Sequence, residues 1–290
     1  MKTIAIVLNP TKNEAVELVR ALVPRLQDRG VAVIMEHDAA RVTGFQRLSR
    51  DNKQLTAADF ALVLGGDGTL LRASRVMAPA GVPMLGIRYG KFGFMTDVEP
   101  QDAEEAVNSV LHGEYVVEER MMLRARVMRA GQSVASAVAL NDAVIHKGPL
   151  ARMLSLETCV SAKYIATYQS DGLIIATPTG STAYSLSAGG PLVAPELSVM
   201  IITPICPHTL TVRPLLVSSR ETVKVLIGGD TEETVMLTVD GQIGVPLEED
   251  DEVCVGESEY KAKLIRVGDI TFFDKLQSRL RWGGRFDCET

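Results

Sequence analysis

The stretch Phe60-Ala61-Leu62-Val63-Leu64-Gly65-Gly66-Asp67-Gly68-Thr69 passes from a continuous apolar run into a turn that is rich in glycine. Such a run is typical of a strand that is buried on both faces of a parallel sheet. Residues 70–77 then look helical, and a break containing two prolines at residues 79–83 precedes another apolar run at residues 84–87. The sequence therefore predicts a strand, a glycine turn, a helix and a further strand.

The same pattern occurs at the beginning of the chain. Residues 3–8 form an apolar run, and apolar side chains then recur at helical spacing until Gly30 ends the helix. Residues 31–35 are apolar again, which indicates a parallel pair of strands joined by a crossover helix. The first part of the chain is thus predicted to be a doubly wound α/β domain.

The pattern changes to strands and turns after a predicted helix at residues 103–111. Residues 122–129 alternate, with Leu123, Ala125 and Val127 on one face, which is typical of a half-exposed strand. Further short apolar runs follow as far as residue 255 and predict a β-rich domain. We expect one domain at residues 1–118, completed by the apolar tail at residues 265–290, and a second domain at residues 119–264.

The composition narrows the classes of function. The chain has 290 residues, 46% of them hydrophobic, and a formal net charge of -6. This charge offers no basic field for a nucleic-acid backbone or an anionic membrane, so neither is predicted as a partner. The four cysteines show no metal-ligand or redox-pair spacing, and no apolar segment reaches the length of about 18 residues that a membrane span needs. We therefore expect a cytoplasmic protein.

Asp67 is the unexpected residue in the glycine turn. Glycines let the backbone approach a ligand closely, and the following helix would present its N-terminal amides to phosphate. A carboxylate is repelled by phosphate, so Asp67 needs a separate purpose, such as metal binding, proton abstraction or capping of the helix. The turn matches neither the dinucleotide fingerprint nor the Walker A loop. It predicts phosphate chemistry without selecting a substrate.

A second cluster of ligand-binding residue types occupies residues 171–191. An apolar strand there runs into Thr177-Pro178-Thr179-Gly180-Ser181-Thr182-Ala183-Tyr184-Ser185, a run of small and hydroxyl side chains. Such residues can line a surface for a flat ligand, with Tyr184 as an aromatic wall. From the residues alone, a Ser/Thr-rich turn without a ligand is an equally good interpretation.

These two motifs carry a resemblance to a known family. Gly65-Gly66-Asp67-Gly68 resembles an element shared by NAD kinases, diacylglycerol-type lipid kinases and phosphofructokinases, whereas residues 171–191 resemble a signature of NAD kinases alone. The similarity to NAD kinases extends over nearly the whole chain, as far as Asp240-Gly241-Gln242. It implies a phosphofructokinase-like first domain. It also implies transfer of the terminal phosphoryl group of ATP, with a divalent cation such as Mg²⁺, to the 2'-hydroxyl of the adenosine ribose of NAD.

The resemblance also implies roles for individual residues. Asp67 would accept the proton of the ribose hydroxyl, Arg72 would reach phosphate, and Asn141 with Asp142 would bind the adenosine portion of NAD. The full set of implied catalytic and binding residues is Gly65, Gly66, Asp67, Gly68, Thr69, Arg72, Asn141, Asp142, Arg152, Asp171, Thr182, Ala183, Tyr184, Ser185, Leu186, Ser187 and Gln242.

Two residues depart from the family pattern. Asp142 replaces the commoner Glu and is one methylene shorter, and Arg88 stands where Asn is common, so Arg88 is assigned no contact. The resemblance further implies a homodimer or homotetramer. Two other functions stay open on the sequence, a lipid kinase and a dinucleotide sensor without catalytic activity. The retained carboxylate of Asp67 argues against the sensor, and the acidic chain argues against a membrane substrate.

Overall fold

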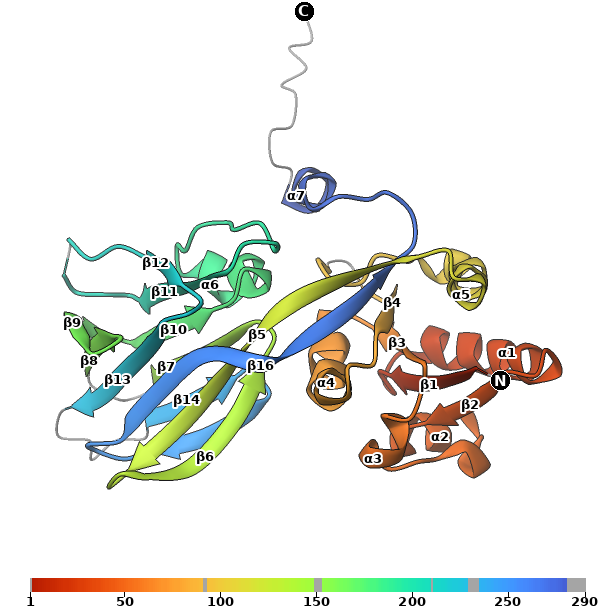
Figure 1. Ribbon diagram of the computed structural model, residues 1–290, viewed down its shortest axis with the longest axis horizontal. Helices are drawn as coiled ribbons and strands as arrows, with labels where there is room; N and C mark the ends of the chain where they lie inside the picture. The colour runs from red at the N-terminus through yellow and green to blue at the C-terminus, as the bar shows by residue number, and fades with distance from the viewer. Residues whose placement is uncertain (1, 91–92, 149–152, 210, 229–234, 281–290) are drawn as a thin grey trace, which may run out of the picture. The chain divides into compact units, whose positions relative to one another are not determined.

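The computed structural model describes residues 2–90, 93–148, 153–209, 211–228 and 235–280. The chain forms two compact units (Figure 1), unit 1 from residues 1–119 and 263–290, and unit 2 from residues 120–262. Two long strands, β5 (Val116–Arg129) and β16 (Glu252–Arg266), each contribute to both units. The chain therefore enters unit 2 along β5 and leaves it along β16.

Unit 1 is built on a parallel sheet in the order β2-β1-β3-β4, to which the end of β16 adds by pairing Leu264 with Met84. Its strands are β1 (Thr3–Leu8), β2 (Ala32–Met35), β3 (Phe60–Gly65) and β4 (Met84–Arg88). Its helices are α1 (Asn13–Asp28), α2 (His37–Thr43), α3 (Asn52–Leu55), α4 (Asp67–Met77), α5 (Ala103–His112) and α7 (Phe272–Leu280).

The order of these strands creates a switch point between β1 and β3. From β1 the chain moves outwards to β2, and from β3 it moves outwards on the other side to β4. Ligands of open parallel sheets bind outside the carboxyl ends of the strands at such a point. Because Gly65 ends β3, the glycine turn lies at this position in the sheet.

The apolar runs of the sequence form the core of unit 1. Every residue of β3 is buried, and the buried face of α1 contributes Val19, Leu22 and Leu26 to the same core as Leu62 and Leu64. Burying a side chain of this size stabilises the fold by about 1.5–3 kcal/mol. The period of the apolar residues therefore decides which face of the helix meets the sheet.

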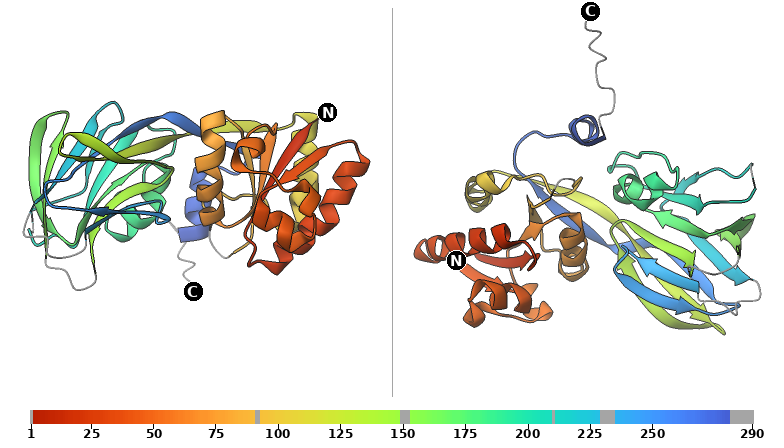
Figure 2. Two further views of the ribbon diagram at one scale, coloured as in Figure 1. Left: turned by 90° about the horizontal axis from the view of Figure 1, so that it is seen from below. Right: turned by 180° about the vertical axis from the view of Figure 1, so that it is seen from behind.

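Unit 2 consists of two largely antiparallel sheets (Figure 2). One contains β5, β6 (Gln132–Ala139), β8 (Leu154–Val160), β9 (Lys163–Ser170), β13 (Thr222–Gly228) and β16. The other has the order β12-β11-β10-β7-β14-β15, with β7 (Asp142–Lys147), β10 (Gly172–Ala176), β11 (Val199–Ile205), β12 (Leu215–Ser218), β14 (Val235–Val239) and β15 (Ile243–Leu247). The short helix α6 (Tyr184–Ser187) follows β10 after a 3-10 turn at Thr179–Thr182.

The core of unit 2 receives side chains from both sheets, for example Val127 and Leu156 from one and Ile145 and Leu173 from the other. The predicted alternation in β5 is confirmed, since Leu123, Ala125 and Val127 are buried whereas Arg126 is exposed. An α/β part followed by a β-rich part is the fold class that the sequence predicts. None of the described helices has the length and apolar character needed to cross a membrane.

Candidate functional site

The glycine turn joins β3 to α4 without an intervening loop. Gly65 is the last residue of the strand, Gly66 is the N-cap of the helix in an extended conformation, and α4 begins at Asp67. A Cβ atom on Gly65 would lie 2.2 Å from Oγ1 of Thr69, so only glycine lets Thr69 fold back over the end of the strand. The backbone amides at the start of α4 are thereby placed at the carboxyl edge of the sheet, where an anion is favoured.

The side chain of Asp67 contacts the loop after β4 and does not cap the helix. Its carboxylate accepts hydrogen bonds from the backbone N–H groups of Phe94 at 2.7 Å and Met95 at 3.2 Å, and from the hydroxyl of Thr96 at 3.4 Å. Burial raises the pKa of Asp67, and the two amides act in the opposite direction. The capping alternative is therefore wrong, and the carboxylate is held by a loop at the end of the sheet.

Arg72 lies one turn further along α4, and its guanidinium is held by neighbours within unit 1. It pairs with both carboxylate oxygens of Glu36, one of them at 3.0 Å from Nη2, and donates to the carbonyl of Leu8 at 3.0 Å. The side chain of Arg72 is still 43% exposed. The residue thus lies beside the end of β1, anchored by an ion pair and partly open to solvent.

A cavity of about 610 Å³ lies within unit 2. Five of the residues that the resemblance implies line it, namely Asn141, Asp142, Asp171, Ala183 and Tyr184. The other lining residues are Val144, His146, Lys147, Gly148, Ile205, Thr238, Asp240 and Gly241. Its size is that of a typical small-molecule site, about 300–1,000 Å³.

Two carboxylates lie close together on the wall of this cavity. Asp240 accepts hydrogen bonds from the backbone N–H groups of Leu140 at 3.1 Å, Asn141 at 2.8 Å and Asp142 at 3.3 Å. Burial, and then the charge of Asp240, raises the pKa of Asp142 to about 7. The amide oxygen of Asn141 is buried and has no hydrogen-bond partner in the part of the chain that the structure describes. It is therefore an acceptor that a ligand can use.

The segment after β10 packs against the backbone around Asn141 and is hydrogen-bonded to it. The hydroxyl of Thr177 donates to the carbonyl of Leu140 at 2.6 Å and accepts from the N–H of Gly180 at 3.0 Å. A Cβ atom on Gly180 would lie 2.2 Å from the carbonyl oxygen of Asn141, so the two backbones approach as closely as they do only because residue 180 is glycine. The small residues after the strand thus fix the backbone that carries the cavity wall.

The other residues implied by the resemblance occupy different surroundings. Ser185 is buried and shares a hydrogen bond of 2.9 Å with Thr203, so it supports α6 from inside. Gln242 is exposed in the turn between β14 and β15. Thr182, Leu186 and Ser187 lie in the same segment as Tyr184 without being among the lining residues of the cavity, and Arg152 lies outside the described residues.

The structure adds residues that the sequence reasoning did not assign. Asp240 contacts the backbone of the Asn-Asp pair, and Lys147 forms an ion pair of 2.8 Å with Asp171 at the edge of the cavity. Asp240 has a signal in the sequence, since it begins the Asp240-Gly241-Gln242 stretch of the family resemblance. Lys147 has none, because a lysine at the end of a strand is usually a solvated charge.

The described residues also limit what kind of metal could bind. Among them, no three His, Cys, Asp or Glu side chains gather closely enough to hold a metal ion by themselves. Mg²⁺ in phosphoryl-transfer sites is usually held by one or two carboxylates together with substrate phosphates and water. A metal ion held mainly by substrate phosphates and water is therefore compatible with the described residues, because it needs few protein ligands.

Comparison with known proteins covers both units. The model of the ATP-NAD kinase N-terminal domain matches residues 4–115, and that of the ATP-NAD kinase C-terminal domain matches residues 140–267. An NAD kinase of Moorella thermoacetica is 45% identical over 284 residues, covering 98% of this chain and 91% of the relative. An NAD kinase of Symbiobacterium thermophilum is 44% identical over 281 residues, covering 97% of this chain and 99% of the relative.

Two solved structures resemble this chain over nearly its whole length. An NAD kinase from Archaeoglobus fulgidus, solved in complex with ATP, is 26% identical with a TM-score of 0.76, covering 96% of this chain and 98% of that chain. A yeast NADH kinase, solved with NADH, has the same fold with a TM-score of 0.90 at 24% identity, covering 100% of this chain and 90% of that chain. The lipid-kinase and sensor alternatives receive no support from these relatives. The chain belongs to the NAD kinase family.

Proposed function

We propose that this chain transfers the terminal phosphoryl group of ATP to the 2'-hydroxyl of the adenosine ribose of NAD and releases NADP and ADP. The observation that carries the proposal is the position of Asp67, a carboxylate at the carboxyl end of β3 whose side chain bonds to a loop and not to the helix that it begins. A carboxylate at a phosphate-binding turn is useful when it removes a proton from the attacking hydroxyl. The family relatives share this activity by name.

The phosphates of ATP would meet the backbone amides at residues 65–69. The N-terminus of α4, a helix of 11 residues, favours negative charge there through its dipole and the N–H groups of its first turn. Mg²⁺, held by the ATP phosphates, would neutralise charge that develops on the transferred group. The glycines keep side chains out of the path of the phosphates.

NAD would occupy the cavity of unit 2. The buried amide oxygen of Asn141 can accept a hydrogen bond from a ribose or base donor, and Asp142 and Asp171 can accept from hydroxyl or amino groups. Tyr184, 46% exposed, presents an aromatic face to a flat group. These contacts would hold the adenosine portion of NAD.

In the reaction, the proton of the 2'-hydroxyl passes to Asp67, the oxygen forms a bond to the terminal phosphorus, and the bond from that phosphorus to the ADP oxygen breaks. The amides of Phe94 and Met95 fix the direction of the carboxylate. A general base contributes about 10²- to 10⁴-fold to the rate, or roughly 3–5 kcal/mol.

The test is the purified protein with ATP, Mg²⁺ and NAD, followed by measurement of NADP. Asp67→Asn keeps the shape of the side chain and should lower kcat by about 10²- to 10⁴-fold, with the Kd for NAD nearly unchanged. Asp28→Asn is the matched control, since Asp28 is exposed in α1. Absence of NADP with the wild-type protein would overturn the proposed function, and near-normal turnover of Asp67→Asn would remove Asp67 from the chemistry.

Three further properties stay predictions. Assembly as a homodimer or homotetramer is tested by light scattering after size-exclusion chromatography. The requirement for a divalent cation is tested by chelation followed by addition of Mg²⁺. Cytoplasmic residence is tested by fractionation of cells that express the chain.

A further inference from the structure

Helix α7 places two cationic side chains against the loop that holds Asp67. Lys275 is only 3% exposed, and its ammonium group donates to the carbonyl of Phe94 at 3.1 Å and pairs with Asp97 at 2.6 Å. A lysine is rarely buried to this extent unless it is paired. The contact therefore connects the last described helix firmly to residues 94–97.

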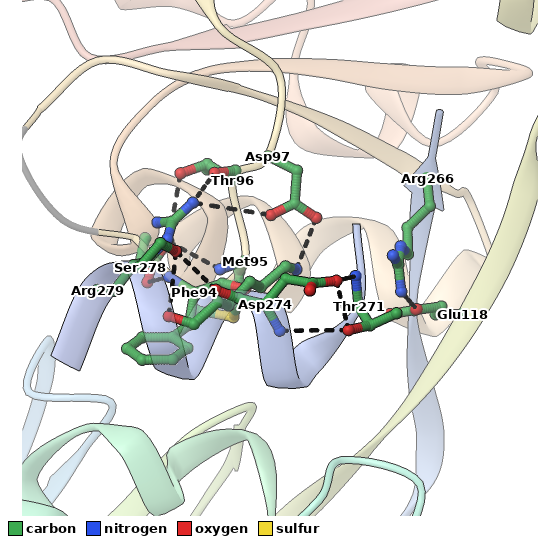
Figure 3. A network of polar contacts seen from close by, with 12 residues as sticks. Phe94, Met95, Thr96, Asp97, Glu118, Arg266, Thr271, Asp274, Ser278 and Arg279 are labelled. Atoms are coloured by element: carbon green, nitrogen blue, oxygen red, sulfur yellow. Dashed lines mark hydrogen bonds and ion pairs between the residues drawn. The ribbon is translucent and has the colours of Figure 1, made fainter. Parts of the chain in front are cut away.

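Arg279 lies one turn further along α7 and faces the same loop. Figure 3 shows its guanidinium turned towards Thr96 and Asp97, with Nη2 at 3.5 Å from the carbonyl of Thr96 and 4.0 Å from the carboxylate of Asp97. The side chain is 13% exposed, and within the described ranges its Nη1 is buried without a hydrogen-bond partner. A Cβ atom on Gly93 would lie 3.4 Å from this nitrogen and 2.8 Å from Oδ1 of Asp67, so both charged groups face residue 93.

Two residues of this loop, Phe94 and Thr96, each form hydrogen bonds both to Asp67 and to α7. Phe94 donates its N–H to Asp67 and accepts from Lys275 through its carbonyl, and Thr96 donates its hydroxyl to Asp67 and accepts from Arg279 through its carbonyl. Each of these two loop residues therefore transmits a contact from α7 to the carboxylate. Movement of α7 would move the groups that orient Asp67.

Helix α7 is itself anchored at its beginning. The carboxylate of Asp274 accepts from the N–H of Thr271 at 2.8 Å and from its hydroxyl at 2.5 Å. Arg266, just before α7, forms an ion pair with Glu118 of β5, and Leu276 is buried. The two cations thus project from a helix that is fixed at its start and on its buried face.

We propose that Lys275 and Arg279 are positioning residues for Asp67, because α7 holds residues 93–97 and thereby sets the direction of the carboxylate. The inference rests on the proposed function of Asp67 as the proton acceptor. It adds a contribution from a helix about 200 residues further along the chain, outside both motifs that identify the family.

The electrostatics have a direction that can be tested. Burial raises the pKa of Asp67, and the charge of Arg279 lowers it. Among the described residues, Arg279 is the charged group that acts on this pKa, whereas Arg88 at the end of β4 and Asp97 in the loop act on Arg279. Removing the charge of Arg279 should therefore raise the pKa of Asp67 and move the acid limb of the pH profile of kcat to higher pH.

The first experiment compares Arg279→Gln with Arg25→Gln. Both changes remove one positive charge from unit 1, but Arg25 is 61% exposed and pairs with Glu104. We expect the loss of kcat in Arg279→Gln to increase as the pH is lowered, and Arg279→Lys to restore the acid limb because it keeps the charge. A ratio of variant to wild-type kcat that is independent of pH would overturn the electrostatic part of the inference.

The second experiment tests the clamp. Lys275→Met keeps the length of the side chain and removes both contacts, so we expect kcat to fall about 10- to 100-fold with the KM for NAD nearly unchanged. Gln277→Met, on the exposed face of α7, is the control. Thermal midpoints show whether each variant folds. If Lys275→Met does not fold, the comparison of Arg279→Gln with Arg279→Lys still tests the inference. If wild-type protein makes NADP and Asp67→Asn does not, while the folded α7 variants behave like their controls, the inference fails and the proposed function stands.

Discussion

Replacing Asp142 with Asn should make the protein more stable at alkaline pH. Asp142 is 5% exposed, and burial together with the charge of Asp240 raises the pKa of its carboxyl group from 3.8 to about 7. An acid with a higher pKa in the folded chain binds more protons when folded, so the free energy of unfolding falls as the pH rises from about 4 to about 7. Asn has nearly the same shape and cannot ionise, so the variant lacks this loss.

The size of the effect follows from the same shift. Between pH 5 and the folded pKa of about 7, Asp142 costs about 1.4 kcal/mol per pH unit, or roughly 2–3 kcal/mol in total. The gain of Asp142→Asn over wild type should therefore be roughly 2–3 kcal/mol larger at pH 8 than at pH 5. Comparing the two pH values cancels any difference between Asp and Asn that does not depend on ionisation.

The assay is urea unfolding of wild type and variant at both pH values, followed by circular dichroism. Asp250→Asn is the matched control in unit 2, because Asp250 is exposed and its φ of 63° is one that Asn tolerates. The control should give nearly the same difference from wild type at pH 5 and pH 8. If Asp142→Asn does the same, or gains more at pH 5, then Asp142 is not the buried acid described above.

Two further substitutions test close contacts at the two sites. Gly93→Ala places a Cβ atom 2.8 Å from Oδ1 of Asp67, so kcat should fall about 100-fold while the circular dichroism spectrum stays unchanged. Wild-type turnover of this variant would show that the loop moves to accommodate the methyl group without disturbing Asp67. Thr177→Val removes the hydroxyl that bonds to Leu140 and Gly180, and should lower the free energy of unfolding by about 1–3 kcal/mol in urea, whereas an unchanged midpoint would show that water replaces both bonds.

The sequence was sufficient to predict the glycine turn and the fold class, because both depend on local patterns. An uninterrupted apolar run and a following break determine where β3 ends, and the period of the apolar residues determines the faces of α1 and β5. The sequence pattern predicts the start of α4 near Leu70, which is too late, because the helix begins at Asp67. The glycine at position 68 disfavours a helix by its propensity, yet Gly66 provides the N-cap and the helix begins at Asp67.

Contacts between distant residues could not be predicted in the same way. Asp240 lies 98 residues beyond Asp142, and Lys275 lies 181 residues beyond Phe94. A cation on an amphipathic helix usually indicates a solvated face, so Lys275 gave no signal in the sequence. For Arg72 the sequence does give a signal, because its position in the helix suggests a phosphate contact. In the structure its guanidinium forms an ion pair with Glu36.

The passage of β5 and β16 between the units has a consequence for synthesis of the protein on the ribosome. Domains usually fold as units in the order in which they are made. Here the first unit to emerge is completed only by residues 263–280, which are translated after all of unit 2. A nascent or prematurely ended chain that stops at residue 262 already contains the glycine turn and Asp67, but it lacks Lys275 and Arg279. By the positioning role proposed above, such incomplete copies would consume little ATP, and full activity would need α7 to have been translated.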